Sequence, residues 1–230
     1  MDTEQIVAFA RQFNNVALLT YLIPLVVGIW RWKSLLTVYR PLVWFAIVPG
    51  CLLNGLLAEI GRHILHNNIF FLQLATIGET LFLGWAYHYA FHSSFARKVL
   101  AGGALIFLAT YFIEAFYIND FGVGQDIYTH VVQSLLLVGA AVAYFEQTLR
   151  ELRNIDLGED PMFMVSVGSI LYYAGTLMVF VLESQMQSQP DLIWTMYMIQ
   201  FILLIVFNVF LTIAIWNGNH QTECISSVSQ

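Results

Sequence analysis

The chain has 230 residues, of which 59% are hydrophobic and only 10% are charged. A soluble domain carries about 25% charged residues, so this chain has too little charge to cover a water-facing surface, and most of its surface must face lipid. A formal net charge of −6 excludes the basic surface that nucleic-acid binding needs, and the isolated Cys51 and Cys224 form neither a disulfide framework nor a metal-ligand spacing.

Seven apolar runs, each near the length that a helical membrane span needs, follow one another along the chain. Because backbone groups in hydrocarbon must satisfy their own hydrogen bonds, each run is expected to be a helix. The predicted fold is an all-α bundle of seven transmembrane helices, one domain over 1–230, with a mobile cytoplasmic tail at 217–230. The runs are Phe13–Trp30, Pro41–Ile60, Ile69–Phe91, Val99–Ile118, Tyr128–Leu149, Met162–Glu183 and Leu192–Trp216.

Prolines interrupt or begin three of these runs. Pro24 and Pro49 lie inside the first two runs and are expected to kink them. Pro161 begins the sixth run, where its missing N–H costs nothing.

The basic residues predict the orientation. Only Arg11 and Arg62 fall on the side of the N-terminus, and the other basic residues fall on the opposite side. The positive-inside rule therefore predicts an external N-terminus and a cytoplasmic C-terminus in the inner membrane. The residues on the predicted inner side are Arg31, Lys33, Arg40, Arg97, Lys98, Arg150 and Arg153.

Polar residues within the runs concentrate in the predicted outer half. This asymmetry predicts a polar cavity that opens outward, with Glu79 at its floor. We expect a ligand or proton-linked site made of Glu79 with its neighbours Thr76 and Thr80 on one helix face, and of six further polar groups from the same run and the four runs that follow it. Those groups are Gln73, Glu114, Gln133, Tyr172, Gln200 and Asn208, and Asn54, Glu59, Glu183 and His130 share the outer half.

Glu79 carries the functional hypothesis, because a carboxyl group at bilayer depth costs about 2.5–3.5 kcal/mol to insert. The alternative is a structural role in which Glu79 bonds Asn208 or a threonine and holds helices together. For Glu59, Glu114 and Glu183 the alternative is simple exposure at the membrane interface.

A metal site is a weaker alternative. Glu59 with His63 and Asp126 with His130 are two i, i+4 pairs at the outer face, and carboxylate and imidazole suit zinc. No HExxH run accompanies them, so neither a metal nor another cofactor is predicted. Retinal attachment is excluded because no lysine lies inside a run.

The last third of the chain carries a motif. Gly168-Ser169-Ile170-Leu171-Tyr172-Tyr173-Ala174-Gly175 is followed by a final run that contains Asn208. This pattern resembles a group of small, poorly characterised seven-helix bacterial membrane proteins, in which a Gly-x-Leu-Ile-Tyr-Phe-x-Gly helix precedes an Asn-containing last helix. Genes of that group often neighbour sensor histidine kinases, so the resemblance implies a sensory or regulatory role.

The function expected is therefore that of a membrane-embedded sensor or signalling accessory protein, not an enzyme. Its expected partners are the lipid bilayer, a small ligand and a sensor kinase or another membrane protein, with no nucleic acid. A small proton-coupled transporter using Glu79, and a metal-dependent membrane hydrolase, are the alternatives.

Overall fold

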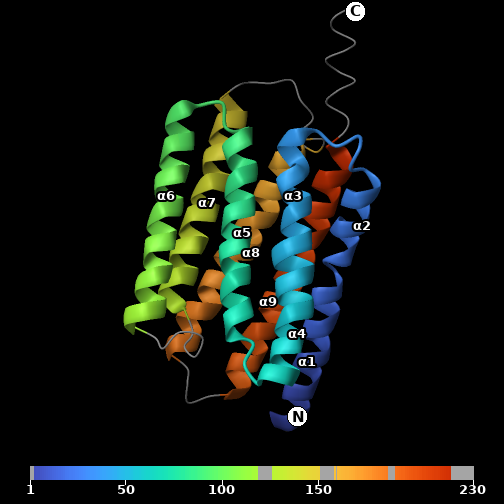
Figure 1. Cartoon of the computed structure of the whole chain (residues 1–230), viewed down its shortest axis with the longest axis vertical. Helices are drawn as coiled ribbons and strands as arrows, with labels where there is room; N and C mark the ends of the chain where they lie inside the picture. The colour runs from blue at the N-terminus through green and yellow to red at the C-terminus, as the bar shows by residue number, and fades with distance from the viewer. Residues whose placement is uncertain (1–2, 119–125, 151–157, 159, 186–189, 219–230) are drawn as a thin grey trace, which may run out of the picture.

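The computed structural model describes residues 3–118, 126–150, 158, 160–185 and 190–218. Throughout this part of the chain the regular secondary structure is helical and contains no strand. It forms seven helices that are long and apolar enough to cross a membrane. Figure 1 shows them side by side, with the start of the first span and the end of the last at opposite ends of the bundle. Most of the predicted tail and Arg153 lie outside the described residues.

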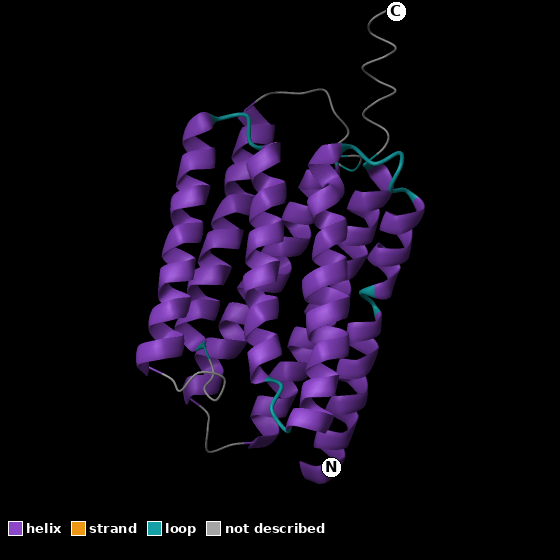
Figure 2. Cartoon of the chain, viewed as in Figure 1, coloured by secondary structure: helices purple, strands orange, loops and turns teal. Residues whose placement is uncertain are grey.

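The first span consists of two helices, α1 (Thr3–Leu19) and α2 (Leu22–Trp30). The break falls at Thr20 and Tyr21, just before Pro24, and Figure 2 shows it as a short loop midway along the span. Pro24 has no N–H to donate to the carbonyl of Thr20, four residues earlier, and its ring crowds that carbonyl. The predicted kink is therefore a complete interruption of the helix.

The second span follows a short 3₁₀ turn, η1 (Thr37–Tyr39), and changes character at Pro49. An α-helical start gives way to a long π-helical segment around the proline, whose missing N–H breaks the i→i−4 ladder. The span ends at Leu65 and not at the predicted Ile60, and His66 closes it in the left-handed conformation with φ 53°. Its segments are α3 (Arg40–Phe45), η2 (Ala46–Leu57), α4 (Ala58–Ile60) and η3 (Gly61–Leu65).

The remaining five spans agree with the predicted runs to within a few residues. The fourth begins earlier than predicted, at Ser94, because Ser93 caps it by accepting from the amide of Ala96 at 3.5 Å. These spans are α5 (Ile69–Ala90), α6 (Ser94–Ile113) continuing as η4 (Glu114–Ile118), α7 (Ile127–Arg150), α8 (Pro161–Gln185) and α9 (Pro190–Asn217).

Helix α8 begins where Pro161 predicts. The carboxylate of Asp160 accepts from the amide of Met162 at 2.9 Å, and its second oxygen accepts from the hydroxyl of Tyr144 at 2.8 Å. Further along α8, a Cβ at Gly168 would lie 3.0 Å from Cβ of Phe210, so this position permits close packing of α8 on α9.

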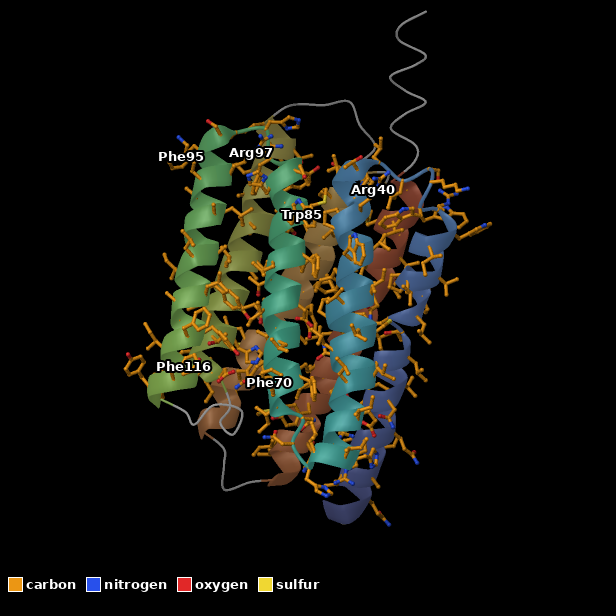
Figure 3. All side chains as sticks on the ribbon, in the orientation of Figure 1. Arg40, Phe70, Trp85, Phe95, Arg97 and Phe116 are labelled. Carbon is orange, nitrogen blue, oxygen red and sulfur yellow. The ribbon has the colours of Figure 1, made fainter. Side chains whose placement is uncertain are left out.

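The apolar core occupies the half of the bundle nearer the α5–α6 turn. Leu83, Ala86 and Tyr87 of α5 are fully buried there, together with Phe45 of α3 and Phe207 of α9. Arg40 and Arg97 lie at this end, opposite Phe70 and Phe116, as Figure 3 shows. The half nearer the N-terminus is less completely filled, and the candidate site lies in it.

Candidate functional site

A cavity of about 830 Å³ lies in the N-terminal half of the bundle, between α1, the second span, α5, the start of α7, α8 and α9. The exposed side chains of Arg11 and Arg62 line it at the end of the bundle, and Glu79 lines it in the middle of α5. Below Glu79, the next turns of α5 present the fully buried Leu83 and Tyr87 to the apolar core. The cavity therefore extends inward from one end of the bundle, and Glu79 is at its floor.

Glu79 is 7% exposed and accepts hydrogen bonds from two other spans. Asn54 of η2 donates from Nδ2 to Oε1 at 3.1 Å, and the hydroxyl of Tyr173 on α8 donates to Oε2 at 3.4 Å. These bonds fix the carboxyl group between the second, third and sixth spans. Burying a polar group without hydrogen-bond partners is unfavourable, and these bonds offset that cost for Glu79.

Aromatic rings surround this carboxyl group. Tyr21, at the break between α1 and α2, and Tyr172 of α8 both line the cavity. Tyr172 stacks on Phe207 with ring centroids 5.4 Å apart and meets Tyr173 edge-on at 4.9 Å, so the aromatic wall is held by packing from α9.

A second hollow, of about 30 Å³, adjoins Glu79 between α5, α7 and α8. Gln133 lines it and donates from Nε2 to the backbone carbonyl of Thr76 at 3.2 Å. His130 also lines it; its ring stacks on Phe180 at 4.1 Å, and its Nδ1 lies 3.3 Å from Oε1 of Gln133.

Five of the predicted site residues line the main cavity, namely Gln73, Thr76, Glu79, Tyr172 and Gln200. Gln73 is 5% exposed, and neither its amide oxygen nor its amide nitrogen has a hydrogen-bond partner among the described residues. Thr76 turns its hydroxyl back to the carbonyl of Leu72 at 3.1 Å. Gln133 joins this set through the adjoining hollow.

Three predicted site residues lie elsewhere. Thr80 is 1% exposed, bonds the carbonyl of Thr76 at 2.9 Å and lines neither hollow. Asn208 donates to the hydroxyl of Thr20 at 2.7 Å and not to Glu79, the partner that the structural alternative considered for it, because this face of α9 meets the break in the first span.

Glu114 has a structural position. Its Oε2 accepts from the amide and the hydroxyl of Thr129, both at 2.7 Å, and its Oε1 accepts from the amide of Tyr128 at 3.1 Å. At 1% exposed it is not an interfacial carboxylate. It caps the N-terminus of α7, where free amides and the helix dipole favour a negative charge. Glu59, in contrast, is half-exposed, and the side chain of Glu183 lies outside the described residues.

The candidate metal ligands are not gathered. Glu59 lies 2.9 Å from Nε2 of His63 and 3.0 Å from Arg62, an exposed cluster at the end of the second span. Asp126, which precedes α7, and His130 of α7 line the cavity. No group of three or more His, Cys, Asp or Glu side chains positioned to hold a metal occurs in the described part of the chain.

Asn54 is predicted in the outer half but not among the site residues, and Tyr21 and Tyr173 are not among the predicted site residues either. Asn54 could have been found, because it is a polar residue within an apolar run, as Glu79 is. The two tyrosines could not be selected in this way, because tyrosine is also frequent at the membrane interface and its presence in a run does not indicate a site.

No family model matches the sequence, and comparison with the curated proteins and with the solved structures found no match. The residues and their geometry, with the motif on α8 and α9, are therefore the basis for assigning a function.

Proposed function

We propose that the protein is a multi-pass membrane sensor that binds a small molecule in the cavity above Glu79. The observation that carries the proposal is the cavity itself, which ends on a buried carboxyl group held by Asn54 and Tyr173. Ligand sites in proteins are concave, mostly apolar and lined by a few convergent polar groups, with volumes of about 300–1,000 Å³. An intramembrane carboxyl group marks a functional site by default.

The packing around Glu79 supports a sensing role. The carboxyl group receives hydrogen bonds from the second and sixth spans, and both spans continue from there into the apolar core at the other end of the bundle. A ligand that rearranges these bonds changes the position of the two spans relative to each other, and this change reaches the end of the bundle where Arg40 and Arg97 lie. With the predicted orientation, that end faces the cytoplasm, where a sensor kinase is the partner that the motif resemblance suggests.

The test replaces the chromosomal gene with wild type, Glu79→Gln or the matched control Glu59→Gln, and compares transcript profiles with a deletion strain. Glu59 is a carboxylate at the same end of the bundle but half-exposed and outside the cavity lining. A sensor predicts that Glu79→Gln shifts the profile toward that of the deletion while Glu59→Gln matches wild type, with equal protein in the membrane by immunoblot. A wild-type profile for Glu79→Gln contradicts the proposal.

A small proton-coupled transporter is the second candidate, because the same carboxyl group lies near the middle of the bundle. Below Glu79 the bundle is closed by Leu83 and Tyr87, and a transporter must open this region to release its substrate. Uptake by proteoliposomes under a pH gradient separates the two: a transporter gives Glu79-dependent flux, and a sensor gives none.

A further inference from the structure

The ligand class can be inferred from the charges that line the cavity, and this inference rests on the proposed function. Arg11 and Arg62 are the basic residues among its described lining, and both are at the mouth. Arg62 pairs with Glu59 at 3.0 Å, and Asp126 adds a second acid near the same end. The formal charges of the mouth therefore cancel, and Glu79 remains as an uncompensated acidic group at the floor.

Glu79 also has unused hydrogen-bonding capacity. A carboxylate accepts at about four lone-pair sites. The described donors to Glu79 are Asn54 at 3.1 Å, Tyr173 at a long 3.4 Å and the side chain of Gln133, and all three are neutral. No described basic side chain forms an ion pair with it. A buried carboxylate of this kind is stabilised most by a partner that brings both a positive charge and N–H donors.

The walls next to Glu79 suit the same partner. Tyr21 and Tyr172 line the cavity beside it and are 1% and 8% exposed, with aromatic rings fixed by Phe45 and Phe207. Tyrosine rings attract an organic cation by about 0.5–2 kcal/mol, most strongly where water is excluded. An inorganic cation gains less here, because it needs several oxygen ligands and the described residues offer no cluster of acids.

Gln73 supplies the second recognition point. Both polar atoms of its buried amide lack partners, and the side chain lines the cavity. An unpaired buried amide is costly, so a ligand that offers both a donor and an acceptor there gains the energy of satisfying it. Gln73 precedes Glu79 on α5 and is displaced from it by about 9 Å along the helix axis toward the mouth.

We propose that the ligand is an elongated organic amine whose ammonium group binds Glu79 between Tyr21 and Tyr172, and whose hydroxyl, amide or similar group binds Gln73. The ammonium donates to the carboxylate, the chain lies along the cavity wall, and the distal group exchanges hydrogen bonds with the Gln73 amide. No covalent step is involved.

The test is calorimetric titration of the purified protein in lipid nanodiscs, with empty nanodiscs as the blank. The probes are aminohexanol, hexanediol and hydroxyhexanoate, which have similar length but carry a positive, zero and negative charge at one end. Hexylamine is a fourth probe that lacks the distal hydroxyl. We expect aminohexanol to bind wild type at least about tenfold more tightly than hexanediol, the effect of one charge-assisted hydrogen bond.

Two variants assign the contacts. Glu79→Gln is expected to abolish the preference for aminohexanol over hexanediol. Glu146→Gln, which removes an exposed carboxylate away from the cavity, is expected to retain it. Gln73→Leu is expected to weaken aminohexanol binding while leaving hexylamine unchanged. If Glu79→Gln does not fold, the affinities of wild type for aminohexanol, hexanediol and hydroxyhexanoate still decide whether the ligand is an amine.

Two results overturn the inference and separate it from the proposed function. Equal affinity for aminohexanol and hexanediol, or tighter binding of hydroxyhexanoate, overturns the amine and leaves the cavity as a ligand site. Absence of binding by every probe overturns the amine, and the transcript test with Glu79→Gln then decides the proposed function by itself.

Discussion

Asn54 of the second span donates a hydrogen bond of 3.1 Å to Oε1 of Glu79 in the middle of α5. The donor lies on the π-helical segment that contains Pro49, and the acceptor is the carboxyl group at the floor of the cavity. The pair joins a proline-distorted helix to the residue on which the proposed function depends.

We expect Asn54→Ala to destabilise the protein. Removing the amide takes away one of the described donors to Glu79, and an under-satisfied buried group costs about 1–3 kcal/mol. The measurement is the midpoint of thermal unfolding in detergent, followed by circular dichroism. Asn15→Ala, at an exposed position on α1, is the control and should unfold at the wild-type temperature. Equal unfolding midpoints for both variants would show that the bond between Asn54 and Glu79 makes no net contribution to stability.

Glu114→Ala should lower stability without altering ligand binding. The substitution removes the carboxylate that accepts from the amides of Tyr128 and Thr129, and loss of such a cap costs about 0.5–2 kcal/mol. Thermal unfolding measures the loss, and titration with aminohexanol measures binding. Glu146→Ala removes an exposed carboxylate paired with Arg150 and should change stability by less than about 1 kcal/mol. If a folded Glu114→Ala protein no longer bound aminohexanol, Glu114 would be part of the ligand site.

The two glycines of η2 should respond differently to alanine. A Cβ at Gly50 would lie 2.7 Å from Cε1 of the buried Tyr21, whereas a Cβ at Gly55 meets only the carbonyl of Gly50, at 3.6 Å. Gly50→Ala must displace the ring and should cost about 1–3 kcal/mol, and Gly55→Ala should be neutral or stabilising. Thermal unfolding of both variants tests this, and equal midpoints would contradict the close approach of Tyr21 to the second span.

Cysteine labelling tests the orientation predicted from the basic residues. In a background with Cys51→Ser and Cys224→Ser, Arg11→Cys and Arg97→Cys place single thiols at opposite ends of the bundle. An external N-terminus predicts that a membrane-impermeant maleimide labels Arg11→Cys in intact cells and labels Arg97→Cys only after permeabilisation. The reverse pattern would place the cavity mouth in the cytoplasm.

The helices could be predicted from the sequence because apolar length alone determines a membrane span. In the described part of the chain, seven helices long and apolar enough to cross a membrane occur where seven apolar runs predict them, and Pro161 begins α8 as expected. The break at Thr20 and Tyr21 and the π-helical segment around Pro49 were predictable only as kinks. A proline removes one hydrogen bond, but the neighbouring helices decide how the backbone re-forms.

The site was predictable in composition but not in pairing. Gln73, Thr76, Glu79, Tyr172 and Gln200 were selected by depth and line one cavity. The partners of Glu79 were not predictable, because a π-helical turn contains more residues than an α-helical turn, so the face occupied by Asn54 does not follow from a 3.6-residue period. Asn208 and Glu114 share the polarity and depth of the site residues, but the packing of α9 and α7 directs them to Thr20 and Thr129.

The most direct test of the central claim, a cavity that enters from the N-terminal end and finishes at Glu79, is thiol accessibility along α5. Thr76→Cys places a thiol in the cavity lining just above Glu79, and Leu83→Cys places one in the fully buried core just below it. In the cysteine-free background, a small water-soluble thiosulfonate is predicted to modify Thr76→Cys and to leave Leu83→Cys unmodified until the protein is denatured. Modification of both thiols at similar rates, or of neither, would contradict a water-accessible cavity with Glu79 at its floor.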